Sequence, residues 1–422
     1  MTNDQKIDIV ILSNGPGEII TWVRPVVKTL RQQLDNSNNK IRISVILAPC
    51  PHSTGKETAI ALDYPEVDRV LAPDDFFAFL LFGKTKDNWN WSKQGIVIFL
   101  GGDQFYTVVI SKRLGYSSVV YAEWDARWYR WVNHFAVMNE KVVEKLPIAY
   151  RHKCTVVGDL IADVSLEVQN NNDISVKNTD KITIGLLVGS KSAKLFQGVP
   201  LCLAVAEIIY QQQPQVEFII PVAPTLNLET LASYANSQYN PLVTQFGGIE
   251  GSLIATQQEN SQIITTNGVK IQLITQFPAY GILTQCQLCL TTVGANTAEL
   301  AALGIPMIVL LPTQQLDAMK AWDGLPGILA NLPGVGSLFA KLINWLIIKQ
   351  KRWFAWPNIW ANSPIVPELV GKLQPEAIAN LVLDYLANPE RLQVMSDRLI
   401  AVRGKAGAAK QIATIVRQEL YW

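Results

Sequence analysis

The hydrophobic residues in the first half of the chain fall into short continuous runs, which are separated by helical patterns. The runs predict strands at Ile7–Leu12, Ile43–Leu47, Ile96–Leu100, Ser118–Tyr121 and His134–Val137. Between the first two runs, the apolar positions of Trp22–Leu34 repeat along one face of a helix. Continuous apolar strands joined by helices are typical of a parallel sheet that is covered on both faces.

The same alternation starts again after the polar, Asn-rich stretch Glu167–Asp180, which we interpret as a linker. The strands predicted beyond it are Ile182–Val188, Glu217–Val222, Ile271–Ile274, Leu288–Thr291 and Met307–Leu311, with a helix near Leu201–Gln211. Two halves that each open with a strand and a Gly-bearing loop predict an α/β protein of two Rossmann-like domains. We expect these domains to face a central cleft, because ligands bind at the carboxyl ends of such strands.

The expected boundaries follow from this pattern. Residues 1–166 form the first domain, 167–180 the linker and 181–374 the second domain, and 375–422 are C-terminal helices that pack back across the cleft. Pro375 suits the start of a helix, and Asn388-Pro389 interrupts the helical pattern.

Composition excludes several other classes of protein. The 422 residues are 49% hydrophobic and 17% charged, which favours ordered domains. Lys and Arg number 36 and Asp and Glu 35, so no overall basic field indicates binding to nucleic acid. The N-terminus carries no cleavable apolar leader, and the five cysteines suggest no disulfide framework, so we expect a cytoplasmic protein. Cys286 and Cys289 adjoin an apolar strand without a second ligand pair, which favours buried thiols over a metal site.

Three loops between a strand and a helix could bind a nucleotide. The first contains Gly15, Gly17 and Glu18, and its glycines let the backbone approach a ligand closely. The second, Gly189-Ser190-Lys191, combines backbone N–H groups, a hydroxyl and a cation, which suits a diphosphate. For both loops an ordinary turn is the alternative.

The third loop carries the most information. Gly294, Asn296 and Thr297 leave room for phosphate at the start of a helix, and Glu299 could accept hydrogen bonds from both ribose hydroxyls. The alternative role for Glu299 is to complement the helix dipole. In the first half, Asp103 follows the predicted strand Ile96–Leu100, where it could act as a general base or cap the next helix.

At these residues the chain resembles lipid-A-disaccharide synthases, which are glycosyltransferases of the GT-B fold. The similar segments are SNGPGE, GGDQF, VVYAEWDARW, VVGDLIADV, LLVGSK, TTVGANTAELAALGIPMIV and WPNIWANSPIVPELV. The resemblance implies Asp103 as base, Glu299 at the donor ribose, Ser190 and Lys191 at its diphosphate, and Asn358 and Glu368 lining the donor site.

The chain also departs from that family's pattern. Asp159 stands where the family has His, and Lys191 stands where it has Arg and so lacks the bidentate geometry of Arg. Glu123-Trp124-Asp125 replaces a Pro- and Ser-rich end. The resemblance therefore indicates a diverged, related subfamily. The peptidoglycan glycosyltransferases of the same fold are a weaker match, because their Gly-Gly-Thr-Gly-Gly-His loop is absent.

An apolar insert at 324–356 suggests contact with a membrane. Its core, Val335–Ile348, is too short to span the ~30 Å interior of a bilayer. Lys, Arg and Trp follow it, so residues 335–356 suit an interfacial helix on the cytoplasmic face of a membrane. A second apolar run, Phe76–Phe82, could be another contact or a groove for an acceptor tail. A buried helix or a homodimer interface is the alternative for both.

We therefore expect an inverting glycosyltransferase that takes a UDP-sugar as substrate and a lipid or lipid-linked acceptor. No DxD motif lies at a predicted strand end, so neither a donor-chelated metal nor a separate cofactor is expected. The rivals are a nucleotide-sugar epimerase or hydrolase of the same fold, with Glu123 and Asp125 as extra acids, and a non-catalytic protein that binds sugar nucleotides or lipids. An NAD-linked enzyme is a weaker rival, because GxGxxG is absent.

Overall fold

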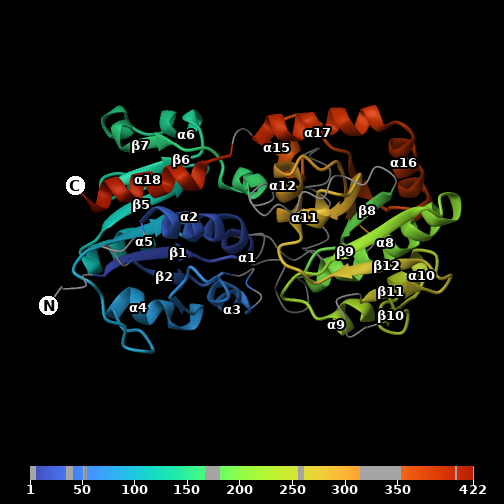
Figure 1. The fold of residues 1–422 in the computed structure, drawn as a ribbon, viewed down its shortest axis with the longest axis horizontal. Coiled ribbons are helices and arrows are strands. Elements are labelled where there is room, and N and C mark those ends of the chain that lie inside the picture. Colours follow the sequence, from blue (N-terminus) through green and yellow to red (C-terminus); the bar gives the residue numbers. More distant parts are fainter. Residues whose placement is uncertain are drawn as a thin grey trace, which may run out of the picture. The chain divides into compact units, whose positions relative to one another are not determined.

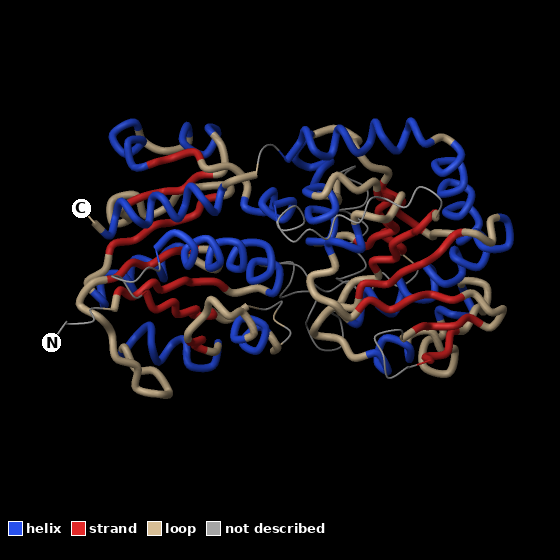
Figure 2. Tube along the Cα trace, in the orientation of Figure 1, coloured by secondary structure: helices blue, strands red, loops and turns tan. Residues whose placement is uncertain are grey.

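The computed structural model describes residues 6–34, 41–50, 53, 55–166, 181–254, 261–313, 353–403 and 406–421. The chain divides into two compact units (Figure 1). Residues Met1–Glu167 and Gly404–Trp422 form the first unit, and Val168–Arg403 form the second. Each unit contains one sheet with helices packed on it (Figure 2).

The first sheet is parallel throughout its described strands and has the order β3-β2-β1-β4-β5-β6-β7. These strands are β1 (Ile7–Ser13), β2 (Ile41–Leu47), β3 (Arg69–Leu71), β4 (Gly95–Phe99), β5 (Ser117–Ala122), β6 (His134–Val137) and β7 (Cys154–Val156). The order reverses between β1 and β4, which is the topological switch point where open α/β sheets bind ligands.

The second sheet has the order β10-β11-β12-β9-β8-β13-β14-β15, and its strands are parallel from β12 to β15. Two antiparallel pairings, β10 with β11 and β11 with β12, complete one edge. The strands are β8 (Ile182–Leu187), β9 (Val216–Pro221), β10 (Gly251–Ile254), β11 (Gln262–Thr265), β12 (Lys270–Ile274), β13 (Leu288–Thr292), β14 (Met307–Pro312) and β15 (Glu368–Gly371). Here the switch point lies between β8 and β13.

The helices of the first unit are short, apart from three of eleven to thirteen residues. They are α1 (Pro16–Glu18), the π-turn η1 (Ile19–Val23), α2 (Arg24–Leu34), α3 (Glu57–Leu62), η2 (Pro73–Asp75), α4 (Phe76–Phe82), α5 (Gln104–Leu114), α6 (Glu140–Glu144), η3 (Ile148–Lys153), η4 (Leu160–Asp163) and α18 (Ala408–Leu420). Those of the second unit are α8 (Ser192–Gln212), α9 (Leu228–Ser233), α10 (Leu242–Gln245), α11 (Tyr280–Leu283), α12 (Ala295–Ala302), α15 (Trp356–Ala361), α16 (Pro375–Ala387) and α17 (Pro389–Arg403).

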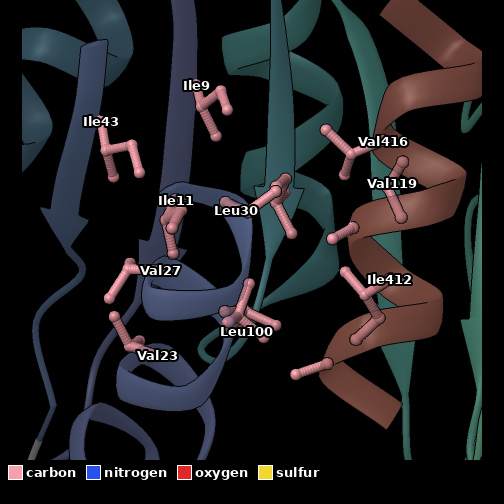
Figure 3. Close-up of a cluster of buried hydrophobic side chains, with 14 of the residues drawn as sticks. Ile9, Ile11, Val23, Val27, Leu30, Ile43, Leu100, Val119, Ile412 and Val416 are labelled. Atoms are coloured by element: carbon pink, nitrogen blue, oxygen red, sulfur yellow. The ribbon is translucent and has the colours of Figure 1, made fainter. Parts of the chain in front are cut away.

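Two apolar layers hold the first unit together. Side chains of α2, α3 and α18 cover one face of its sheet, and those of α4 and α5 cover the other. Figure 3 shows the first layer, in which Val27 and Leu30 of α2 lie near Ile11 of β1, and Ile412 and Val416 of α18 lie near Val119 of β5. Because the inner strands are buried on both faces, their sequences read as continuous apolar runs.

The C-terminal helices divide between the two units. Helices α16 and α17 belong to the second unit, and α18 belongs to the first. The buried carboxylate of Asp163 accepts hydrogen bonds from the backbone N–H groups of Gly407, Ala408 (3.2 Å) and Ala409 (2.7 Å). These donors lie at the start of α18, where backbone N–H groups lack helical partners. Asp163 therefore fixes the last helix to the first unit.

Most predicted strands agree with the structure to within two residues, but the start of α8 differs from the prediction. The pattern placed this helix near Leu201–Gln211, whereas α8 begins at Ser192 and contains Pro200. Proline has no N–H to donate to the carbonyl four residues earlier. Asn240 Nδ2 donates to that carbonyl, on Phe196, at 2.8 Å. A side chain from elsewhere in the unit thus compensates for the proline.

Candidate functional site

Two of the predicted loops lie side by side at the switch point of the second sheet. Strands β8 and β13 are neighbours, with Leu187 paired to Thr291, and the loops that follow them contain Gly189 and Gly294. Gly189 has φ +90° and Gly294 has φ +147°, a region that favours glycine. The starts of α8 and α12 follow directly, so the backbone N–H groups of two helix N-termini come from this edge of the sheet.

Lys194 fills the space between these two loops and was not among the residues predicted from the sequence. Its Nζ donates to the Val293 carbonyl at 2.6 Å. A Cβ atom added to Gly294 would lie 2.7 Å from Nζ, and one added to Gly189 would lie 3.0 Å from Cδ of the same lysine. Burial, with a contribution from the nearby Lys191, lowers the pKa of Lys194 to about 8.

Thr292 is a second buried polar residue at this place. It is the last residue of β13, and its Oγ1 has no hydrogen-bond partner among the described residues. A Cβ atom on Gly189 would lie 3.2 Å from that oxygen. Neither Thr292 nor Lys194 was among the predicted site residues, although Thr292 lies in the similar segment TTVGANTAELAALGIPMIV. For Lys194 the available clue was its position three residues after the predicted Lys191, one helical turn further on.

The predicted residues of the Gly189 loop lie nearer to solvent. Ser190 is exposed, and Lys191 is half-buried at the N-cap position of α8 without a side-chain capping bond. Asn296 is half-buried in the first turn of α12. These side chains are accessible to a ligand.

Glu299 and Thr297 have different surroundings although both lie on α12. Thr297 Oγ1 donates to the Gly294 carbonyl at 2.9 Å and accepts from the Trp356 N–H at 3.2 Å, so it links α12 to α15. The Glu299 carboxylate has no hydrogen-bond or ion-pair partner within the described part of the chain. Burial raises its pKa to about 7.

The hydrogen-bonding capacity of Asn358 and Glu368 is largely taken up by the protein itself. Asn358 is fully buried; its amide accepts from the N–H groups of Ile365 and Val366 and donates to the Val366 carbonyl and to Glu368. Glu368 accepts from the backbone of Phe354 and Ala355, between 2.8 and 3.1 Å. Through these hydrogen bonds the two side chains connect the start of α15 to β15.

In the first unit, the loop with Gly15, Gly17 and Glu18 meets the loop after β4. A Cβ atom on Gly101, which has φ +156°, would lie 3.0 Å from Asn14 Oδ1 and 3.3 Å from Glu18 Cγ. Asn14 Oδ1 is buried and has no partner among the described residues. The Gly17 carbonyl accepts from Thr21 Oγ1 at 2.9 Å. These loops occupy the switch point of the first sheet, between β1 and β4.

Asp103 is exposed and caps α5. Its Oδ1 accepts from the Phe105 N–H at 2.9 Å. The adjacent Gln104 is buried; its side chain donates to the Asp125 carbonyl at 2.9 Å and accepts from the Arg127 N–H at 2.8 Å. This contact places the segment with Asp125 beside the start of α5. Asp103 belongs to the first unit and the Glu299 group to the second.

Most of the insert at 324–356, including the predicted membrane core, lies outside the described residues, and only Trp353–Trp356 are described. The second apolar run forms α4, in which Phe77, Leu81 and Phe82 are exposed by 51%, 59% and 69%. Among the helices in the described ranges, α8 alone has the length and hydropathy of a membrane span, and most of it is buried inside the second unit.

Comparison with known proteins relates the chain to one group of enzymes. No family model matches it. The lipid-A-disaccharide synthase of Nitrosococcus oceani is 26% identical over 230 residues, which cover 54% of this chain and 46% of that protein. That of Persephonella marina is 24% identical over 264 residues, or 62% and 56% of the two chains. The chain thus matches about half the length of these relatives.

Solved structures of similar fold cover nearly the whole chain. The UDP-GlcNAc 2-epimerase of Neisseria meningitidis, bound to UDP-GlcNAc, has a TM-score of 0.52 at 13% identity and covers 98% of this chain and 100% of its own. A putative UDP-N-acetylglucosamine 2-epimerase of Listeria monocytogenes has a TM-score of 0.52 at 12% identity, covering 99% and 97%. These likenesses agree with two Rossmann-like domains of the GT-B type. The chain is a diverged relative of the lipid-A-disaccharide synthases, built on that fold.

Proposed function

We propose that this protein is an inverting glycosyltransferase that moves a sugar from a UDP-sugar to a lipid or lipid-linked acceptor. The observation that carries the proposal is the edge of the second sheet, where two glycine loops lead into two helix N-termini and where α12 carries Glu299, whose carboxylate has no partner among the described residues. The sequence relation to lipid-A-disaccharide synthases supports the same donor chemistry and a lipid-linked acceptor.

The donor would bind in the second unit. Backbone N–H groups at the starts of α8 and α12 would receive the diphosphate, because helix N-termini favour anions. Glu299 would accept hydrogen bonds from the ribose hydroxyls. A ligand that donates hydrogen bonds favours the ionised carboxylate, so nucleotide binding would lower the raised pKa of Glu299.

The acceptor would bind in the first unit, where Asp103 would take the proton from its hydroxyl. The resulting oxygen nucleophile would attack the anomeric carbon on the face opposite the diphosphate, and the bond from that carbon to UDP would break. Positioning of the two substrates and stabilisation of the leaving diphosphate would supply most of the rate enhancement. The exposed apolar side chains of α4 suit the acyl chains of a lipid acceptor or the surface of a membrane.

The nucleotide-sugar epimerase is the main rival. It would need acids near the anomeric carbon, and Asp125 is a candidate; it is exposed and forms a 3.3 Å ion pair with Arg127. The second rival is a protein that binds a sugar nucleotide without reaction. Both rivals share the predicted donor site, so they differ from a transferase only in what becomes of the sugar.

The donor site can be tested by thermal unfolding with nucleotides. We expect UDP to raise the Tm of the wild-type protein, and Glu299→Ala to remove most of that shift, because binding to the folded state stabilises it. Thr230→Ala on α9, also in the second unit, is the control and should keep the shift. Indifference of the wild-type protein to every nucleoside diphosphate would refute the proposed donor.

Analysis of the products then separates transfer from its rivals. Incubation with UDP-GlcNAc and a monoacylated or diacylated glucosamine phosphate should release UDP and yield a lipid-linked sugar. A C2-inverted sugar without transfer would identify an epimerase. Bound but unchanged donor across a panel of lipid acceptors would favour the binding protein.

A further inference from the structure

The space between Gly189 and Gly294 contains a cation and a hydroxyl that were not among the predicted site residues. Lys194 Nζ lies against the Gly294 loop, and Thr292 Oγ1 lies against Gly189. Nζ has three N–H donors, of which one bonds to the Val293 carbonyl. Thr292 Oγ1 has no partner among the described residues, although more than nine-tenths of Thr292 is buried.

The position of Lys194 is electrostatically unfavourable in the free protein. No carboxylate forms an ion pair with it within the described ranges, and Lys191 adds like charge nearby. It also stands in the first turn of the twenty-one-residue helix α8, where the helix dipole disfavours a cation. The missing ion pair, the like charge of Lys191 and the helix dipole are each less unfavourable when an anion binds, because the anion attracts both lysines and the helix N-terminus.

Only glycine fits beside Lys194 and Thr292 at these two positions. Any side chain at Gly294 would begin 2.7 Å from Nζ, and one at Gly189 would begin 3.2 Å from Thr292 Oγ1. Both glycines also hold positive φ angles, so other residues would strain the backbone there. With glycine at both positions, no side chain of residue 189 or 294 covers the ammonium or the hydroxyl, both of which are buried.

We infer that Lys194 and Thr292 are the residues that bind the donor diphosphate, and that Lys191 of the Gly-Ser-Lys loop contributes only long-range charge. Lys194 donates its two remaining N–H bonds to phosphate oxygens, and the Thr292 hydroxyl donates one. The N–H groups at the starts of α8 and α12 complete the coordination. This inference rests on the proposed function for the identity of the ligand, but the anion pocket itself does not depend on the nucleoside.

The test measures the binding of three probes, uridine, UDP and inorganic pyrophosphate, by titration calorimetry on the full chain. The variants are Lys194→Met and Thr292→Val, with Lys191→Met as the matched control for the loss of one charge from the same loop. We expect Lys194→Met to lower the affinity for UDP and for pyrophosphate by about tenfold or more, and Thr292→Val to lower it by about threefold or more. The lysine variant should lose more affinity because charge-assisted hydrogen bonds are stronger than neutral ones. Uridine should bind all variants with equal affinity. Lys191→Met should lose less affinity for UDP and pyrophosphate than Lys194→Met does.

A stability measurement separates a ligand role from a structural one. Because the buried charge of Lys194 destabilises the ligand-free protein, Lys194→Met should raise the Tm at pH 7 while lowering the affinity for UDP. Equal UDP affinity of Lys194→Met and wild type, or equal losses for uridine and UDP, would overturn the inference. A wild-type protein that binds pyrophosphate through Lys194 but no uridine compound would support the pocket and refute the proposed donor. Binding of neither UDP nor pyrophosphate would refute the pocket.

Discussion

At the scale of single residues, Asp103 combines a structural and a proposed chemical role. Its carboxylate caps α5, and asparagine caps helices about as well as aspartate does. We expect Asp103→Asn to keep the Tm and the UDP affinity of the wild-type protein while transfer slows by about a hundredfold or more, as for loss of a general base. Initial rates of UDP release in the presence of the lipid acceptor measure this.

The matched variant Asp103→Ala removes both roles. It should show the same slow transfer and, in addition, lose about 1 kcal/mol of the free energy of unfolding through the missing cap. Wild-type rates in Asp103→Asn would leave Asp103 as a cap alone and would shift the search for a base to other residues of the first unit.

Glu299 predicts a pH dependence of stability. Burial raises its pKa from 4.5 to about 7, so between these values the folded protein holds a proton that the unfolded chain releases. The free energy of unfolding therefore falls as pH rises through this window. Glu299→Gln should remove the loss and be more stable than wild type at pH 8, by up to about 3 kcal/mol, and should match it at pH 4. Urea unfolding of the ligand-free proteins at both pH values tests this, and an equal difference at both would contradict it.

The loops of the candidate site could be predicted from the sequence, whereas the contacts within them could not. Gly189, Gly294 and Glu299 were predicted because strand ends and helix starts are visible as changes in the apolar pattern. Lys194 was missed because its contact with the Val293 carbonyl joins residues 99 positions apart. Asn358 and Glu368 came from the family resemblance, and no spacing rule could show that their bonds close on each other and on nearby backbone.

At the scale of elements, buried parallel strands were the most predictable part. Strand β6 has the predicted bounds His134–Val137, because a run buried on both faces is apolar throughout. The antiparallel strands β10 and β11 were not predicted. Half-buried residues alternate with exposed or fully buried ones along them, and residues 255–260, between the two strands, lie outside the described residues. Strand β3 has only three residues, too few to establish a period.

Helix boundaries depended on contacts that are distant in sequence. The start of α8 was predicted too late in the chain because Pro200 normally ends or kinks a helix. In the structure Asn240, forty-four residues from Phe196, supplies the lost hydrogen bond. The position of α18 depends in the same way on Asp163, which lies 246 residues before Ala409. Local patterns predict that a helix forms, but such partners decide where it begins and which unit it joins.

At the scale of the whole molecule, the two units have separate chemical tasks in the proposed reaction. The second unit presents the sheet edge at which we propose that the nucleotide binds. The first presents α4, whose last carbonyls, on Leu80 and Leu81, accept from the Arg113 side chain at 3.1 and 2.8 Å. The helix end is therefore held in place although the large apolar side chains of Leu81 and Phe82 there are exposed to solvent, as is Phe77 at the start of the helix. An exposed apolar surface of this kind suits contact with a lipid or a membrane.

This arrangement predicts that the protein binds vesicles of anionic lipid through apolar contact and that α4 contributes to it. Replacing Phe77, Leu81 and Phe82 together by serine should lower the fraction that floats with vesicles by about tenfold or more, because each large side chain contributes roughly 1.5–3 kcal/mol on transfer from water. Ile148→Ser, at an exposed isoleucine of the same unit, is the control and should float as wild type does.

Deletion of Leu338–Trp353 tests the insert separately. If the serine variant floats like wild type while the deletion does not, the insert alone is the membrane contact, and α4 is left as a groove for the acceptor tail, which would appear as a raised KM for the lipid at unchanged KM for the UDP-sugar.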